Sequence, residues 1–155
     1  EGADLVTAWA YRPGVKFLIA SSVGRGFIVL ADDMVATTRK GRQVLTLDDR
    51  EMAKFIVPVE GDYVAAIGEN RKLLCFKLDQ MVEMARGKGV KIQKYKDGGM
   101  ADIKTFKLSE GLTWKDSAGR TFTVTKAEIK EWIGNRADAG RLPPKGFPKS
   151  NRFSA

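Results

Sequence analysis

Histidine is absent from the 155 residues of this sequence, and there is a single cysteine, Cys75. Without histidine, a Ser-His-Asp triad and histidine-based general acid–base catalysis are excluded. One cysteine cannot close an intramolecular disulfide or supply a zinc site of the usual Cys/His spacing. Cys75 stands between Leu74 and Phe76, which predicts a buried, inert thiol. We therefore expect no catalytic residue, no metal site and no cofactor in this chain.

Long hydrophobic runs are lacking as well. No apolar stretch approaches the roughly 18 residues of a membrane-spanning helix. The first apolar stretch is interrupted by the Arg-Pro-Gly sequence at 12–14, so no signal peptide is indicated. With 43% hydrophobic and 30% charged residues, the composition is typical of a globular domain. We expect a cytoplasmic protein without a membrane partner.

What the sequence does have is an excess of positive charge. Lysine and arginine number 27 against 19 acidic residues, a net charge of +8. Residues 1–60 hold eight basic and eight acidic side chains, so the whole excess lies in 61–155. Two stretches, 86–96 and 141–155, contain basic but no acidic residues. A solvated face explains either stretch alone, but a polyanion would relieve the repulsion within both.

Short apolar runs, separated by glycine and charged turns, recur along the chain at 17–20, 27–30, 43–47, 55–57 and 63–67. Runs of this length, with turn signals at intervals of roughly 8–12 residues, indicate an all-β sandwich, barrel or propeller. The exception is Thr125 with Glu128, a capping box followed by apolar residues at helical spacing. We predict a short helix near 126–134.

The sequence also repeats itself weakly at a period of 47 residues. This shift places Asp32 on Asp79, Met34 on Met81 and Arg39 on Arg86. A period near 47 with about four strands per unit is typical of propeller-like blades. We expect one domain over 1–155, built from three repeats at about 17–63, 64–110 and 111–155.

Two long segments, 64–92 and 113–147, resemble the C-terminal domain of the A subunit of bacterial topoisomerase IV, a relative of the DNA gyrase A C-terminal domain. The resemblance is strongest at Leu-Thr-Trp-Lys-Asp-Ser-Ala-Gly-Arg-Thr-Phe (112–122) and Gly-Arg-Leu-Pro-Pro-Lys-Gly-Phe-Pro (140–148). It implies a β-pinwheel of propeller-like, antiparallel blades with duplex DNA bent around a basic rim. Three repeats are fewer than a complete pinwheel of this family, so we expect a partial one, in a fragment.

The resemblance also implies a parent enzyme. That enzyme uses ATP and Mg²⁺ to pass one duplex through another at the nucleoid, decatenating and relaxing DNA for chromosome segregation. Its catalytic residues lie in other regions, and its partners are the ATPase subunit of the enzyme and a second copy of the A subunit. The glycine–arginine box of the gyrase relative is not intact here; its nearest remnants are 38–42, 85–89 and 136–141. Gyrase-like wrapping is therefore disfavoured.

Glycine turns let backbone amides approach phosphates that lysine and arginine neutralise. The predicted DNA-contacting residues are Arg25, Arg39, Lys40, Arg42, Arg71, Lys72, Arg86, Lys88, Lys91, Lys94, Arg120, Arg136 and Arg141. The alternatives are an RNA-binding β-barrel, for which Tyr95 is the best-placed aromatic residue, and a protein-interaction propeller. Arg136 or Arg141 has the further alternatives of pairing with Asp138 or capping the preceding helix.

Overall fold

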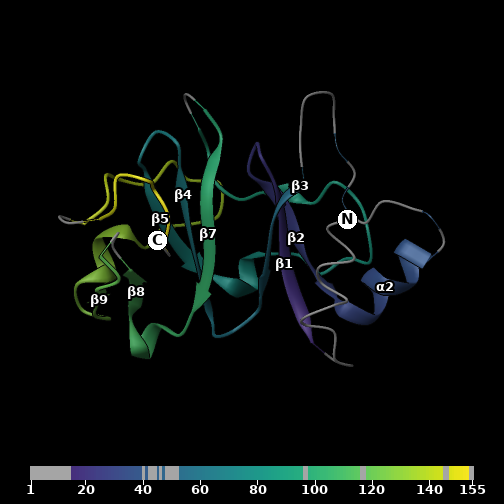
Figure 1. Cartoon of the computed structure of the whole chain (residues 1–155), viewed down its shortest axis with the longest axis horizontal. Helices are drawn as coiled ribbons and strands as arrows, with labels where there is room; N and C mark the ends of the chain where they lie inside the picture. Colours follow the sequence, from purple (N-terminus) through teal and green to yellow (C-terminus); the bar gives the residue numbers. More distant parts are fainter. Residues whose placement is uncertain are drawn as a thin grey trace.

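Three antiparallel sheets stand side by side in the computed structural model (Figure 1). It describes residues 15–39, 41, 45, 47, 53–95, 98–115, 118–144 and 147–153; at 34, 35, 37, 38 and 53 it describes the backbone alone. The first sheet has the order β3-β1-β2-β6, with β1 Lys16–Ser21, β2 Arg25–Leu30, β3 Ala53–Pro58 and β6 Val90–Lys91. The second has the order β5-β4-β7, with β4 Tyr63–Gly68, β5 Leu73–Lys77 and β7 Met100–Phe106. The third pairs β8 Leu112–Lys115 with β9 Thr121–Val124.

The strands of the first two sheets pair in the same register once the sequence is shifted by 47 residues. Phe17 of β1 pairs with Val29 of β2, and 47 residues later Val64 pairs with Phe76. The third strand follows the same shift, since β1–β3 and β4–β7 both show an irregularity just before the end of the inner strand. The predicted all-β fold with antiparallel blades is confirmed. The repeat boundaries themselves stay a prediction.

In each of these two blades, one strand also pairs with a segment from a later part of the chain. Along β2, Ile28 bridges Glu83 in parallel and Gly26 pairs with Val90. Along β5, Cys75 bridges Ile133 in parallel and Leu73 bridges Arg141 in antiparallel fashion. We call 83–95 the first crossing segment and 133–141 the second. Because they tie neighbouring blades together, the backbone groups at the edges of β2 and β5 find partners.

The strands are buried on both faces because blades stack on one another. All six residues of β4 are buried. Leu18 and Ile28 of the first sheet share a core cluster with Val64 of the second, while Leu73 of the second packs in a cluster with Trp114 of the third. Burying a large side chain such as these contributes about 1.5–3 kcal/mol, so blade stacking supplies much of the stability.

The helical content differs from the prediction. An α-helix, α2 (Ala31–Arg39), follows β2, where the sequence pattern predicts no helix. Asp32 and Asp33 in its first turn and Arg39 in its last turn complement the helix dipole.

The predicted helix near 126–134 is shorter, a turn followed by the 3₁₀ helix η3 (Ile129–Trp132). The capping box does form, since the Thr125 amide donates to Glu128 Oε1 at 3.0 Å and the Glu128 amide to Thr125 Oγ1 at 3.3 Å. The helix ends at Trp132 because Ile133 already bridges Cys75 of β5. Of the predicted strand 43–47, only Leu45 and Leu47 lie among the described residues, and Leu45 bridges Gly87.

Candidate nucleic-acid interface

Predicted cations meet in pairs where the hairpin turns β1–β2 and β4–β5 reach the edge of the sheets. Arg25 opens β2, and its cross-strand partner is Lys91 of β6. Lys72 directly precedes Leu73, whose bridge partner is Arg141. Arg25 and Lys72 stand 47 residues apart, at equivalent turns. Each of two successive blades thus has a turn cation near a cation of a crossing segment. In the first blade the two are direct cross-strand partners, and in the second they are brought close through the neighbouring residue Leu73.

The first crossing segment places Lys88 and Lys94 near this edge as well, since the Lys88 carbonyl accepts from Arg25 and the Tyr95 ring packs on the Gly24 turn; Arg86 lies beside Gly87, which bridges Leu45. Arg86, Lys88 and Lys94 are exposed, as is Lys91, while Ile92 and Gln93 between them are buried. The Arg25 guanidinium donates from Nη1 to the Lys88 carbonyl at 3.0 Å. The segment therefore turns its positive side chains outward while its apolar and amide side chains hold it to the blades.

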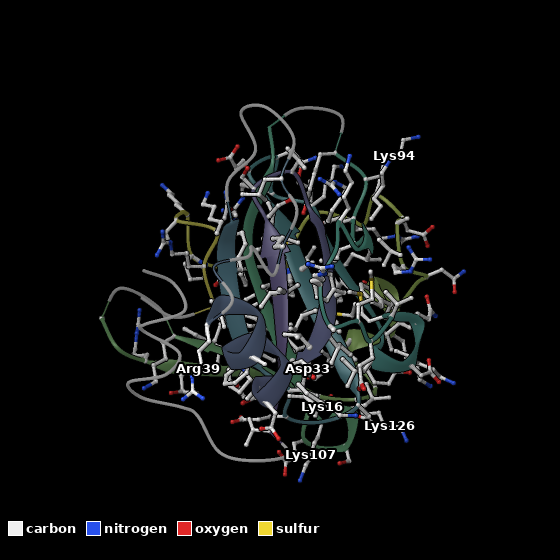
Figure 2. All side chains as sticks on the ribbon, turned by 90° about the vertical axis from the view of Figure 1, so that its right-hand side faces the viewer. Lys16, Asp33, Arg39, Lys94, Lys107 and Lys126 are labelled. Carbon is white, nitrogen blue, oxygen red and sulfur yellow. The ribbon has the colours of Figure 1, made fainter. Side chains whose placement is uncertain are left out.

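The opposite edge has mixed charge. Figure 2 shows Lys94 at one end of the molecule and Lys16, Asp33, Lys107 and Lys126 at the other. Acidic residues of the opposite edge include Asp62, Asp79, Glu83 and Glu110. Lys16 forms an ion pair with Glu83 at 2.7 Å. The hairpin-turn edge also holds two exposed acids, Glu69 and Asp138, whose carboxylates accept hydrogen bonds from the Gly99 and Asn135 amides. Because the predicted cations outnumber them there, a polyanion has one favoured side of approach.

The guanidinium of Arg136 donates hydrogen bonds to backbone carbonyls of this chain. Its Nε donates to the Gln80 carbonyl at 3.0 Å and its Nη1 to the Lys91 carbonyl at 2.9 Å. Its backbone amide donates to Gln80 Oε1 at 2.6 Å. Arg136 therefore joins the two crossing segments, and its contact with DNA stays a prediction.

Arg71 also bonds within the chain. From Nη1 it donates to the Pro148 carbonyl at 3.0 Å and to Asn151 Oδ1 at 2.8 Å. The tail that it holds, 147–153, buries Phe147 and Phe153 in the cluster shared by the second and third sheets. This geometry gives Arg71 a structural role that the sequence pattern does not reveal; its DNA contact is untested.

The other predicted DNA-contacting residues lie in other elements of the fold or outside the described residues. Arg39 ends α2, far from Lys94 (Figure 2). Arg120 lies in the β8–β9 turn with its guanidinium carbon 5.9 Å from the centre of the Phe122 ring. Lys40 and Arg42 are outside the described residues.

Tyr95 is not available for base stacking. A methyl group at Gly24 would meet Tyr95 Cε2 at 2.5 Å, and one at Gly68 would meet Cε1 at 2.6 Å, so the ring lies between these two turns. Its hydroxyl is buried without a hydrogen-bond partner. Burial, and then the nearby charge of Glu69, raise the pKa of the phenol. The RNA-binding alternative thereby loses its best-placed aromatic residue. Polar and apolar residues do not alternate in 91–95, so no sequence signal marks the packed ring of Tyr95 or the buried Gln93.

The described residues offer little reactive chemistry. Burial raises the pKa of the Cys75 thiol to about 12, so the thiolate is scarce at neutral pH, as the sequence context predicts. Within the described ranges, no cluster of three or more His, Cys, Asp or Glu side chains is arranged to bind a metal ion. None of the helices there has the length and apolar character needed to span a membrane.

Curated relatives align with nearly the whole chain. The A subunit of DNA topoisomerase 4 from Rickettsia bellii is 42% identical over 151 residues, which is 97% of the chain, and that from Caulobacter vibrioides is 42% identical over 153 residues, which is 99%. In both cases the chain spans 20% of the relative's length. No family model matches the chain.

Solved structures agree with these relatives. The C-terminal domain of E. coli ParC has a TM-score of 0.74 and 25% identity, over 90% of this chain and 59% of that one. The DNA gyrase A C-terminal domain has a TM-score of 0.65 over 87% of this chain and 49% of that one; its 13% identity shows the shared fold alone. Sequence over nearly its full length and fold together place this chain in the family of C-terminal β-pinwheel domains of the DNA topoisomerase 4 A subunit.

Proposed function

We propose that this chain is a DNA-binding and DNA-bending accessory domain that holds the phosphate backbone of a duplex along its hairpin-turn edge. The observation that carries the proposal is that a turn cation and a crossing-segment cation lie close together in both blades: Arg25 pairs with Lys91, and Lys72 directly precedes Leu73, which bridges Arg141. Lys88 and Lys94 extend the same positive edge. Phosphates carry no base information, so binding of this kind depends little on sequence.

The two cation pairs also favour bending. A duplex that contacts equivalent points on two blades must follow the edge on which they lie. Bending a site of 20–30 base pairs costs about 1–6 kcal/mol in elastic estimates. Each additional phosphate contact releases counterions and offsets this cost.

In the parent protein such a domain would help select and orient DNA for strand passage. The parent would be an ATP-hydrolysing type IIA topoisomerase working in the bacterial cytoplasm at the nucleoid. Its partners would be the ATPase subunit of the enzyme and a second copy of the A subunit. ATP and Mg²⁺ would serve those other parts, and this domain would contribute DNA contacts without a cofactor of its own.

Fluorescence anisotropy with a labelled 30-base-pair duplex, measured across a salt series, tests the proposal. We expect the logarithm of affinity to fall linearly with the logarithm of salt concentration, with a slope of about −0.9 per phosphate neutralised. Replacing Lys88, Lys91 and Lys94 by alanine should flatten the slope by about 2–3. The matched control replaces Lys77, Lys107 and Lys126, three exposed lysines, with the same change of charge.

Two outcomes contradict the proposal. If the wild-type chain does not bind duplex DNA at 50 mM salt, DNA binding is wrong. If the control triple variant weakens binding as much as the edge variant, net charge attracts the DNA and the edge is not its site. A preference for RNA loops over the duplex would support the RNA-binding alternative instead.

A further inference from the structure

Gln93 is a polar side chain buried inside the basic first crossing segment. It is 1% exposed, although Lys91 and Lys94 on either side of it are exposed. Its Nε2 donates to the carbonyl of Lys72 at 2.7 Å and to that of Ala139 at 3.0 Å. The two acceptors belong to the β4–β5 turn and to the second crossing segment. One amide therefore joins three separate stretches of chain.

Stability alone does not account for an amide at this position. Its Oε1 is buried and has no hydrogen-bond partner, and a buried polar group without a partner costs about 1–3 kcal/mol. A methionine has a similar length and would fill much of the same space without that cost. What a methionine lacks is a donor for two carbonyls at once. The retained amide thus points to a role in holding these stretches in a defined arrangement.

The three stretches that Gln93 joins are those that carry the cation pairs. One acceptor is the carbonyl of Lys72 itself, and the other lies two residues before Arg141. Gln93 in turn follows Lys91, the partner of Arg25, by two residues. The side chain therefore lies at the point where the pair of the first blade is connected to the pair of the second.

Neighbouring contacts fix Gln93 itself. On one side the Ile92 amide donates to the Gly24 carbonyl at 2.7 Å, and on the other the Lys94 amide donates to the Asp138 carbonyl at 3.0 Å. The Tyr95 ring then lies between the turns of both blades. The backbone around the Gln93 amide is held from both sides, so the amide can fix the position of one blade relative to the other.

We propose that Gln93 is a positioning residue of the DNA-binding edge. Its amide holds the Arg25/Lys91 pair and the Lys72/Arg141 pair in register, so that both meet the phosphates of one duplex together. This inference rests on the proposed DNA binding. Cations that are already ordered lose less entropy on binding, and pairs in register act as one site.

The test compares Gln93→Met with Thr105→Val. Thr105 is a matched control because it is also buried between blades, and its hydroxyl makes two hydrogen bonds. It donates to the Pro58 carbonyl at 2.8 Å and accepts from the Glu60 amide at 2.9 Å. It lies near the opposite end of the strands, close to Lys107. If Gln93→Met does not fold, Gln93→Asn takes its place, since it keeps an amide that is one methylene too short.

The first measurement needs no DNA. Spin labels at Lys72→Cys and Lys91→Cys, in a Cys75→Val background, report the distance between the two blades' cations. We expect a narrow distribution with Gln93 or with Thr105→Val, and a broad one with Gln93→Met. A distribution that stays narrow with Gln93→Met overturns the inference, and so does equal broadening with Thr105→Val.

The second measurement is the salt dependence of duplex binding, which counts neutralised phosphates. With Gln93→Met we expect a slope flatter by about 2, at unchanged charge, and affinity about tenfold weaker. Thr105→Val should keep the wild-type slope even if its Tm falls. A wild-type slope with Gln93→Met overturns the inference. If the wild type itself does not bind, the proposed function fails, while the distance measurement still decides whether Gln93 positions the cations.

Discussion

The first and second blades share strands and register, yet they differ at one position of the hairpin turn. Gly24 in the first blade and Arg71 in the second lie 47 residues apart, and both have left-handed backbone, with φ of 85° and 64°. Glycine adopts this conformation freely, whereas a residue with a side chain loses about 1–2 kcal/mol. The first blade needs glycine here because the Tyr95 ring packs against it.

The second blade accepts the strained arginine because its side chain makes other contacts. Arg71 holds Pro148 and Asn151 of the tail, and the tail places Phe147 and Phe153 in the core. Hydrogen bonds from a charged donor contribute about 1.5–3 kcal/mol, enough to offset the strain. The strands and their pairing thus follow the 47-residue repeat, whereas Arg71, which departs from the repeat, has a structural role of its own in holding the tail.

The largest expected effect tests whether the two blades are equivalent. Gly89 and Gly140 both have positive φ, and a methyl group at either would collide with backbone, that of Gly26 or that of Leu73. We expect Gly89→Ala and Gly140→Ala each to lower the free energy of unfolding by about 2–3 kcal/mol. Urea denaturation monitored by tryptophan fluorescence measures both.

Gly119→Ala is the control for these variants. Gly119 also has positive φ, but a methyl group there meets no atom within 4 Å. The decrease in the free energy of unfolding for Gly119→Ala should reflect backbone conformation alone and be the smallest of the three. A loss at Gly140 that matches the control would show that the second crossing segment does not pack against its blade as the first one does.

A smaller and more local effect is expected when Arg71 is made to match the first blade. Arg71→Gly relieves backbone strain and removes the contacts to the tail, so Tm should change by only a few degrees. Hydrogen exchange should accelerate at least tenfold at the amides of Lys115 and Phe153, which bond to the Phe153 carbonyl and to Asp102. Lys72→Ala, which removes the neighbouring cation, is the control. Exchange that stays slow in Arg71→Gly would mean that other contacts hold the tail.

The smallest expected effect concerns the two 3₁₀ helices that precede the crossing bridges. The helix η1 (Leu78–Gln80) has no side-chain cap, whereas the capping box of Thr125 and Glu128 precedes η3. Hydrogen bonds from the Thr125 amide and hydroxyl lower the pKa of Glu128. Its contribution is therefore present above the ordinary glutamate pKa and is lost as the pH falls through the lowered value.

We expect Glu128→Ala to lower Tm slightly at pH 7 and to have no effect well below pH 4, since the wild type then loses the same interaction. Thermal unfolding of both proteins between pH 7 and pH 2.5 measures the difference. Glu131→Ala, an exposed acid in the same helix, should leave Tm unchanged at either pH. A Tm difference for Glu128→Ala that persists at low pH would show that its carboxylate is not the source.

Local signals predict the four strands β1 to β4. The runs 17–20, 27–30, 55–57 and 63–67 coincide with strands because apolar β-formers between turns need little tertiary context. The helix α2 is not predicted, and the stretch that aligns with it in the next repeat, around Asp79 and Met81, forms only the short η1. At the candidate nucleic-acid interface, the sequence pattern identifies the positively charged residues but not the residues that lie beside them in the fold.

The sequence by itself determined the basic charge, the want of histidine chemistry, the 47-residue period and the family resemblance, since these depend on residue identity and spacing alone. Only the tertiary structure decided which cations share an edge. Arg25 and Lys91 are 66 positions apart, and Lys72 and Arg141 are 69 apart, yet the crossing segments bring each pair together. It also gave Arg71 and Arg136 their internal hydrogen bonds, buried Gln93 and placed the Tyr95 hydroxyl out of contact with solvent. Pairing between distant strands depends on the closure of the whole fold, and no local pattern of residues encodes it.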